Sequence, residues 1–163
     1  MSRLDSFLRR IIAQRDCLNS AAELISGIKG PVIELGLGNG RTYDHLREIL
    51  PEREIFVFDR RIAAHPDCVP DAAHMILGDI RETLPNARER VPAPAALAHC
   101  DIGTGDAAAN AEIAAFVGRH LVALLAPGAA IVSDQAMARP EWEPLALPGG
   151  IGPGRYHMWR VRP

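Results

Sequence analysis

The sequence predicts a doubly wound α/β fold in three layers, with helices on both faces of a mostly parallel sheet. Apolar segments of strand type alternate with helical segments along most of the 163 residues, an order typical of parallel sheets. Five apolar segments end in an acidic residue, and a glycine-rich loop follows the first of them. Because open α/β sheets bind ligands at the carboxyl ends of their strands, these acids and glycines predict a binding site.

Residues 1–29 are expected to form a helical extension of this domain. An apolar stripe at helical spacing runs along its first part: Leu4, Phe7, Leu8, Ile11 and Ile12. A Ser-x-x-Glu capping box from Ser20 to Glu23 predicts a second, short helix. The extension could pack on the sheet, cover the site as a lid or form a dimer face.

The first strand is expected at residues 32–35, within PVIELGLGNGR. Its apolar residues show no polar alternation, which is typical of a strand buried on both faces. Gly36, Gly38 and Gly40 then allow the backbone to turn sharply and approach a ligand, and a helix follows at residues 42–50. Strand, glycine loop and helix N-terminus together predict a Rossmann-like ligand-binding turn.

The remaining elements continue the alternation. Later strands are expected at residues 55–59, 75–79, 96–101 and 129–133, and helices at residues 81–90 and 106–125. Residues 142–147 and 155–161 flank a segment rich in proline and glycine and predict a C-terminal antiparallel hairpin.

The acids that end the five strands are Glu34, Asp59, Asp79, Asp101 and Asp134. In consecutive parallel strands their carboxylates gather at one edge of the sheet. Such a cluster suits a ligand with cationic groups and ribose hydroxyls and repels a pyrophosphate. No Gly-Lys-Ser/Thr sequence follows the glycines, which argues against a P-loop.

In these motifs the chain resembles the class I S-adenosylmethionine-dependent methyltransferases. ELGLGNG is similar to their E/D-x-G-x-G-x-G motif, and Asp59 follows the last glycine at the distance of their ribose-binding acid. Asp79 and Asp101 match the segments after their third and fourth strands. The resemblance covers residues 31–134 and implies a single methyltransferase-like domain over residues 1–163 with S-adenosyl-L-methionine as its cofactor.

The resemblance also implies roles for individual residues. Glu34 would attract the methionine ammonium, Asp59 would accept hydrogen bonds from the ribose hydroxyls, and Asp79 would accept one from the adenine amino group. The implied cofactor-binding residues are Glu34, Gly36, Leu37, Gly38, Gly40, Thr42, Tyr43, Asp59, Arg60, Gly78, Asp79, Ile80 and Asp101.

The methyl acceptor is expected to be a small molecule, with O-methylation favoured. Family members that methylate nucleic-acid amines carry an Asn/Asp-Pro-Pro-Tyr/Phe motif after the fourth strand, where this chain has DIGTGD. Methyl transfer from a sulfonium gains mainly from alignment and from exclusion of water, so a general base is optional. The candidate catalytic residues are Asp101 and Asp106, followed by His65 and Tyr156.

A magnesium site is a further hypothesis. Asp101, Asp134 and Gln135 resemble the ligands with which catechol-type O-methyltransferases hold magnesium, and three oxygen ligands plus waters suit that ion. Gln135 is one methylene longer than the asparagine of that family, and no basic residue that could deprotonate a hydroxyl is evident. The sequence therefore favours a reaction without a metal.

Two other functions stay open. NAD-dependent Rossmann oxidoreductases also carry an acid about 20 residues after their glycines, but they require G-x-G-x-x-G, whereas Arg41 follows Gly40 directly here. The other alternative is a module that binds S-adenosyl-L-methionine without catalysis, since no unambiguous general base is present.

Composition and charge bear on partners and location. A net charge of −2 without long charged blocks disfavours nucleic acid as a partner, and no apolar run is long enough to span a membrane. Three cysteines in no metal-binding spacing indicate reduced thiols and a cytoplasmic protein. Abundant alanine and arginine with a single lysine point to a bacterial source. We expect a homo-oligomer, because a neighbouring subunit could close a pocket that no inserted domain covers.

Overall fold

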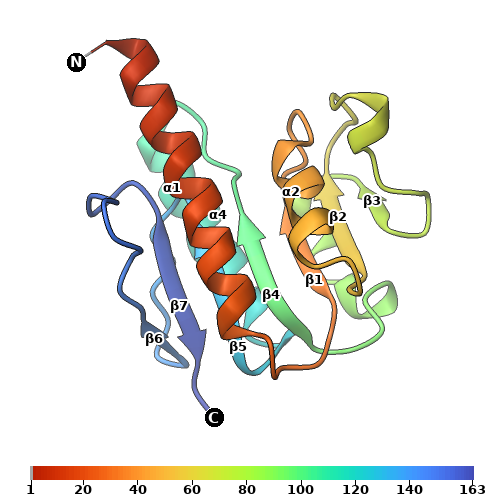
Figure 1. Cartoon of the computed structure of the whole chain (residues 1–163). Helices are drawn as coiled ribbons and strands as arrows, with labels where there is room; N and C mark the ends of the chain where they lie inside the picture. The colour runs from red at the N-terminus through yellow and green to blue at the C-terminus, as the bar shows by residue number, and fades with distance from the viewer. Residues whose placement is uncertain (1) are drawn as a thin grey trace.

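A seven-stranded sheet forms the centre of the computed structural model, which describes residues 2–163 (Figure 1). The strands are β1 (Val32–Leu35), β2 (Ile55–Asp59), β3 (Met75–Leu77), β4 (Ala95–Cys100), β5 (Leu125–Ser133), β6 (Trp142–Pro144) and β7 (His157–Val161). Their order is β3-β2-β1-β4-β5-β7-β6, with parallel pairing from β3 to β5 and antiparallel pairing of β5 with β7 and of β7 with β6. The predicted parallel sheet with a C-terminal antiparallel pair is confirmed.

Helices cover both faces of this sheet (Figure 1). They are α1 (Arg3–Leu24), α2 (Arg41–Ile49), α3 (Ile80–Thr83) and α4 (Ala107–Leu121), with short 3-10 turns η1 (Pro66–Cys68) and η2 (Ala87–Glu89). Side chains of α1 and α2 share one apolar core with the sheet, and side chains of α4 and of the segment around η2 share the other. The three-layer arrangement follows from apolar strands that are buried on both faces.

The N-terminal extension is one helix and not the two that the capping box at Ser20 predicted. Ser2 caps α1 instead: its hydroxyl accepts from the Asp5 amide at 3.0 Å, and the Asp5 carboxylate accepts from the Ser2 amide at 3.1 Å. Ser20 lies inside the helix, because no glycine or proline interrupts it and buried residues continue at helical spacing. These buried residues are Ala13, Gln14, Cys17, Leu18 and Ala21.

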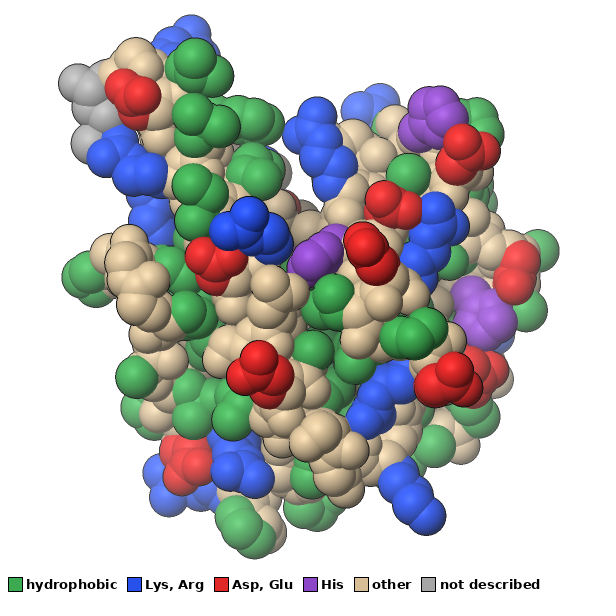
Figure 2. Space-filling view, viewed as in Figure 1, with side chains coloured by type: hydrophobic (Ala, Val, Ile, Leu, Met, Phe, Trp, Pro, Cys, Tyr) green, Lys and Arg blue, Asp and Glu red, His purple; other side chains and the backbone are tan. Residues whose placement is uncertain are grey.

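The apolar stripe at the start of α1 does not pack into the core. The side chains of Leu4 and Phe7 are 65% and 44% exposed, and Leu8 and Ile12 are exposed as well. Figure 2 shows hydrophobic side chains along this upper part of the helix. The second half of α1 makes the contact with the sheet, so simple core packing is wrong for the stripe, whereas its roles as a lid or a dimer face stay predictions.

Two later elements differ from the sequence-based expectation. The predicted helix at residues 81–90 is divided into α3 and η2, and Pro85, which has no amide donor, lies between them. The fifth strand begins at Leu125, four residues earlier than predicted. A register irregularity opposite Ala95 and Leu97 lets this strand include Pro127 and Gly128.

Two observations concern the expected location and redox state. All three cysteines, Cys17, Cys68 and Cys100, are free thiols. Across residues 2–163, none of the helices combines the length and the apolar character needed to cross a membrane.

The Arg53 side chain holds the segment that connects α1 to β1 through hydrogen bonds. Its guanidinium donates to the carbonyls of Ile25, Ile28 and Gly30 at 2.9, 2.7 and 2.7 Å. We expect Arg53→Ala to lower the free energy of unfolding by about 2–3 kcal/mol, because three partly buried carbonyls lose a charged donor. This corresponds to a fall in Tm of about 5–10 °C for a domain of this size, measurable by calorimetry. The matched control is Arg9→Ala at an exposed position of α1; equal stability of the two variants would contradict the assignment.

Candidate functional site

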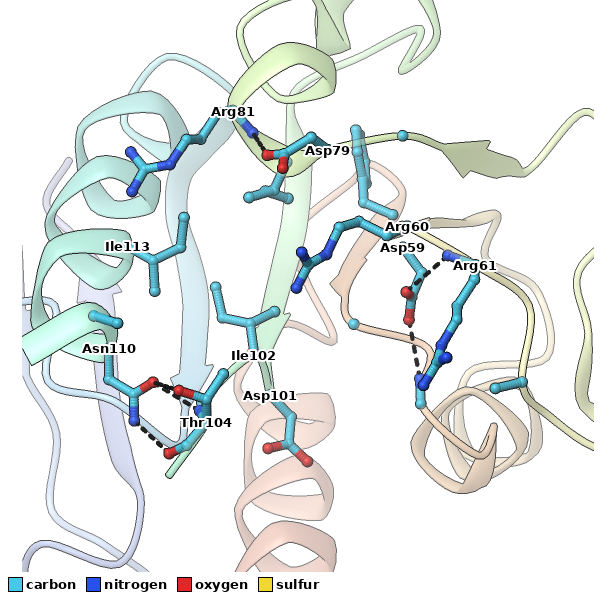
Figure 3. A pocket seen from close by; sticks show the side chains of 18 residues that line it. Asp59, Arg60, Arg61, Asp79, Arg81, Asp101, Ile102, Thr104, Asn110 and Ile113 are labelled. Carbon is cyan, nitrogen blue, oxygen red and sulfur yellow. Dashed lines mark hydrogen bonds between the residues drawn. The ribbon is translucent and has the colours of Figure 1, made fainter. Parts of the chain in front are cut away.

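A cavity of about 960 Å³ opens at the carboxyl ends of β1 to β4 (Figure 3). Eight of the predicted cofactor-binding residues line it: Gly36, Gly38, Asp59, Arg60, Gly78, Asp79, Ile80 and Asp101. The loop after β4 and the start of α4 form the opposite wall, with Ile102, Thr104, Asn110 and Ile113. The structure thus brings most of the predicted residues together at the expected edge of the sheet.

Asp59 connects the end of β2 to the glycine loop. Its Oδ2 accepts from the amides of Leu37 and Gly38 at 2.8 and 3.1 Å, and its Oδ1 accepts from the amide of Arg61 at 3.2 Å (Figure 3). These three amides fix the carboxylate at the cavity wall. Its two oxygens offer about four acceptor positions, of which three are occupied, so the carboxylate can still accept from a ligand hydroxyl at Oδ1.

The glycine loop approaches β4 closely. At Gly36, whose φ is +95°, a Cβ atom would lie 2.6 Å from the carbonyl oxygen of Asp101. At Gly38, whose φ is +52°, a Cβ would meet no atom within 4 Å. Gly36 therefore permits contact between β1 and β4, and Gly38 keeps the loop surface open toward the cavity.

Asp79 lies two residues after β3 and caps the next helix. Its Oδ1 accepts from the amide of Arg81 at 2.9 Å, which fixes the carboxylate at the N-terminus of α3. The adjacent Gly78 adopts a φ of +149°. The carboxylate lies at the rim of the cavity opposite Asn110 (Figure 3), where it can accept hydrogen bonds from a ligand.

A smaller cavity of about 90 Å³ adjoins the first and lies between α1 and the glycine loop. It shares Gly36, Gly38 and Asp101 with the larger cavity. Its other lining residues are Arg10, Ile11, Gln14, Leu37, Asn39, Arg41 and Thr42. Above it, the Arg41 guanidinium lies 5.9 Å from the centre of the Phe7 ring, so α1 and α2 contact each other across the hollow seen in Figure 2.

Asp101 lies where the two cavities meet. Its Oδ2 accepts from the Gln14 amide nitrogen at 2.6 Å, and its Oδ1 lies 3.5 Å from Nη1 of Arg10. The Asp101 side chain is 20% exposed. This half-buried carboxylate lies between two donors on α1 and lines both cavities.

Glu34 does not lie where the sequence predicted it. Its side chain is fully buried and lines neither cavity. One carboxylate oxygen accepts from the Thr42 hydroxyl, and the other lies 3.0 Å from Nδ1 of His99, its neighbour in the β1–β4 register. A strand covered by helices on both faces points this carboxylate into the protein and not at a ligand.

Two further predicted cofactor-binding residues also lie outside the cavities. Gly40, the N-cap of α2, packs so closely that a Cβ would lie 2.6 Å from Cβ of Cys68. The Tyr43 ring lies under the guanidinium of Arg47, 5.6 Å from its centre, and packs against the core. Both residues shape the turn behind the glycine loop.

The other catalytic candidates have structural partners. Asp106 caps α4, where its Oδ1 accepts from the amides of Ala108 and Ala109 at 2.9 and 3.1 Å, and it does not line the cavities. His65 is the exposed N-cap of η1, and its Nδ1 accepts from the Asp67 amide at 3.2 Å. Tyr156 is buried, and its burial raises the pKa of the phenol well above its ordinary value.

The candidate magnesium ligands are not arranged for an ion. Asp134 Oδ2 accepts from the Gly103 amide at 3.1 Å and from the Gln135 side-chain amide at 2.9 Å, so Gln135 presents a donor and not an oxygen. Burial, and then the charge of Asp101, raise the pKa of Asp134. Within the described part of the chain, no three His, Cys, Asp or Glu side chains are placed to hold a metal ion. Asp134 and Gln135 therefore bond to each other in this structure, and Oδ1 of Asp134 is buried without a hydrogen-bond partner among the described residues.

Sequence reasoning missed the polar residues that support this site. Asn110 on α4 fixes the loop after β4: its Oδ1 accepts from the amide and hydroxyl of Thr104 at 2.7 and 3.0 Å, and its Nδ2 donates to the Thr104 carbonyl at 2.8 Å. Gln14 and Arg10 reach the site from α1. The available signals were a lone asparagine among alanines and a glutamine on a face otherwise made of Ala13, Cys17 and Leu18.

The comparisons with known proteins agree on one chemistry. Residues 1–161 match the family model described as S-adenosyl-L-methionine methyltransferase. A crystal structure of an S-adenosyl-L-methionine methyltransferase from Silicibacter pomeroyi DSS-3 is 46% identical and covers 99% of both chains, with a TM-score of 0.92. No curated protein matches the chain significantly.

More distant structures share the fold alone. An S-adenosylhomocysteine-bound methyltransferase from Podospora anserina is 16% identical, with a TM-score of 0.62 over 100% of this chain and 80% of that one. A proposed caffeoyl-CoA O-methyltransferase from Staphylococcus aureus is 10% identical, with a TM-score of 0.61 over 90% of this chain and 82% of that one.

The buried Glu34–His99 pair predicts a pH dependence of stability. Burial lowers the pKa of His99, but the charge and hydrogen bond of Glu34 raise it further, so the pKa lies above its ordinary value. A raised folded-state pKa contributes stability that is complete below the unfolded value of about 6.5 and is lost as the pH rises through the folded value.

We therefore expect the unfolding free energy of the wild type to decline above about pH 6.5 more steeply than that of Glu34→Gln. Urea unfolding between pH 5.5 and 9 measures both slopes. His74, whose pKa is raised by its bond to Asp71, contributes to the slope of both proteins, so the difference between the two slopes does not contain its contribution. We also expect Glu34→Gln to be less stable by about 3 kcal/mol at pH 6, because it breaks a buried pair. Parallel slopes in the two proteins would contradict the ion pair.

Proposed function

Because this chain belongs to the S-adenosyl-L-methionine methyltransferase family, its cofactor is S-adenosyl-L-methionine, and we propose that it transfers the methyl group to a hydroxyl oxygen of a small molecule. The observation that carries the proposal is the junction of the two cavities at Asp101. The two cavities share Gly36, Gly38 and Asp101, and together they extend from Asp79, past Asp59 and Asp101, to α1. An extended ligand with an adenosyl group at one end and an amino acid at the other suits that space.

In the proposed arrangement the adenosyl group occupies the larger cavity. Oδ1 of Asp59 accepts from a ribose hydroxyl, and Asp79 accepts from the adenine amino group. Gly78 and Ile80 border the adenine, and Arg60 lies at the rim beside the ribose. Glycine at position 38 leaves room for the ligand to lie against the loop backbone.

The methionyl group occupies the smaller cavity in this proposal. Asp101 replaces Glu34 as the partner of the ammonium, because the Glu34 carboxylate is buried and already bonded to Thr42 and His99. Arg10, now 3.5 Å from Asp101, is placed to pair with the methionine carboxylate. The methionine ammonium would then pair with Asp101 and the methionine carboxylate with Arg10, in place of the present contact between Asp101 and Arg10.

Catalysis in this proposal rests on placement. S-adenosyl-L-methionine, when bound, would supply the methyl group: the carbon–sulfur bond would break as the carbon–oxygen bond forms, the sulfonium would leave as a neutral thioether, and the hydroxyl proton would pass to bulk water. The protein contributes alignment and a space from which water is excluded. Asp101 acts by fixing the methionyl group and with it the position of the methyl carbon. Asp106, as a helix cap outside the cavities, has no place in this step.

The acceptor side is proposed at the loop after β4. Ile102 and Ile113 give this wall apolar surface, and Thr104 and Asn110 give it polar atoms. The sequence Asp101-Ile102-Gly103-Thr104 stands where amine-methylating relatives have Asn/Asp-Pro-Pro-Tyr/Phe, which supports an oxygen acceptor. A cavity of about 960 Å³ is within the range of small-ligand sites and supports a small acceptor.

Other features of the proposal concern the setting of the reaction. Three free thiols support a reducing compartment such as the cytoplasm. The exposed apolar stripe of α1 supports a homo-oligomer in which a second copy covers Leu4, Phe7 and Leu8. A module that binds the cofactor without turnover is the alternative function, and product formation separates the two.

The proposal is tested by incubating the protein with S-adenosyl-L-methionine and two acceptor panels, one of phenols and alcohols and one of amines. Mass spectrometry would follow S-adenosylhomocysteine and the methylated product. We expect turnover with members of the hydroxyl panel, at rates that EDTA does not change. Turnover with amines alone would overturn the oxygen acceptor, and binding of the cofactor without turnover in either panel would favour the silent module.

Asp59→Ala should reduce the affinity for S-adenosylhomocysteine at least about 100-fold, because ribose bonds to a charged acceptor are lost and the glycine loop loses its anchor. Isothermal titration would measure the affinities. The matched control is Asp71→Ala, which removes an exposed carboxylate from the loop before β3. Unchanged affinity in Asp59→Ala would contradict the assignment of the ribose site.

A further inference from the structure

We propose that Gln14 of α1 is a positioning residue that holds the Asp101 carboxylate toward the cofactor, and that Tyr156, His99 and Glu34 hold Gln14 in place. This inference rests on the proposed role of Asp101 as the partner of the methionyl ammonium. It goes beyond that role because it names four buried side chains, from four parts of the chain, that keep the Asp101 carboxylate in position. Figure 3 shows the Asp101 carboxylate close to α1, and away from Asp79 and Arg81.

The contact between Gln14 and Asp101 is short and sheltered. The Gln14 amide nitrogen lies 2.6 Å from Oδ2 of Asp101 and 2.9 Å from the hydroxyl oxygen of Tyr156. Gln14 is 5% exposed, so water does not compete at this position. A primary amide has two N–H groups, and here each is directed at a different oxygen.

Behind Gln14 the polar contacts continue into the core. The Tyr156 hydroxyl lies 3.0 Å from Nε2 of His99, and Nδ1 of His99 lies 3.0 Å from Oε2 of Glu34. The second oxygen of Glu34 accepts from the Thr42 hydroxyl. Tyr156, His99 and Glu34 are 1%, 0% and 0% exposed, so each is held by its bonds to the next.

The chemistry at position 14 explains why a glutamine stands there. A carboxylate would repel Asp101, an apolar side chain would remove the short bond to Asp101 and leave only the longer contact with Arg10, and a second cation would compete with the ammonium for Asp101. A neutral amide orients Asp101 and leaves its charge intact. Gln14 therefore acts through Asp101 and needs no contact with the cofactor.

The sharpest test is Gln14→Glu, which keeps the shape of the side chain and removes the donor. At high pH the new carboxylate faces Asp101 and repels it. At low pH the two carboxyls share a proton, and the hydrogen bond is restored. The titratable and charged groups around this position are Arg10 on α1, Asp101 after β4, His99 on β4, Glu34 on β1, Asp134 after β5 and Tyr156 before β7.

Isothermal titration with S-adenosylhomocysteine from pH 5.5 to 8 measures the effect, expressed as the Kd of the variant divided by that of the wild type at the same pH. For Gln14→Glu we expect a ratio of about ten or more at pH 8 that falls toward about two at pH 5.5. The matched control is Asn19→Asp, the same change from amide to carboxylate at an exposed position of α1. Its ratio should stay near one throughout.

Two further variants keep the proposal open to refutation should Gln14→Glu not fold. Gln14→Met should raise Kd about five- to tenfold with no pH dependence of the ratio, because it removes the donor without adding a charge. In an Asp101→Asn background the same substitution should add less than about twofold, since Gln14 acts through Asp101.

Equal affinity of Gln14→Met and wild type, or a full additional loss in the Asp101→Asn background, would overturn the proposal. So would a pH-independent ratio for folded Gln14→Glu. These outcomes are separate from the acceptor test, because they depend on cofactor binding alone and not on turnover.

Discussion

The burial of a carboxylate in the central strand is the constraint on which the rest of the molecule depends. Glu34 lies on β1 with helices covering both faces of the sheet, so its two oxygens must find partners inside the protein. They find them in Thr42 of α2 and His99 of β4. His99 in turn needs Tyr156, and Tyr156 contacts Gln14. The requirement to satisfy one buried charge thus connects α1, α2, β1, β4 and the start of β7.

The acids at the edge of the sheet occupy similar positions but bond to different partners. Asp59 holds the glycine loop through the amides of Leu37 and Gly38, Asp79 caps α3, and Asp101 faces α1. These differences arise from the donors that each strand end meets and not from the strand ends themselves. A carboxylate with partly occupied oxygens at a cavity wall is fixed in orientation and can still accept from a ligand.

The two halves of α1 have different surroundings. Its second half packs Cys17, Leu18 and Ala21 into the core, and Arg53 holds the carbonyls that follow it. Its first half exposes Leu4 and Phe7 beside the smaller cavity. The helix therefore joins the candidate site to the core, and its exposed apolar surface lies beside the smaller cavity.

The sequence alone determined the parallel sheet, its terminal antiparallel pair and the edge that carries the site, because these follow from local apolar patterns and from glycines and acids at strand ends. It also determined the cofactor class, through the order of its motifs. Only the tertiary structure decided which of the strand-end acids line a cavity and can contact a ligand. Glu34 and Asp101 look alike in the chain, but the register of β1 with β4 buries one beside His99, whereas the approach of α1 leaves the other at the cavities. Such pairings join residues more than 60 positions apart, and no local pattern specifies them.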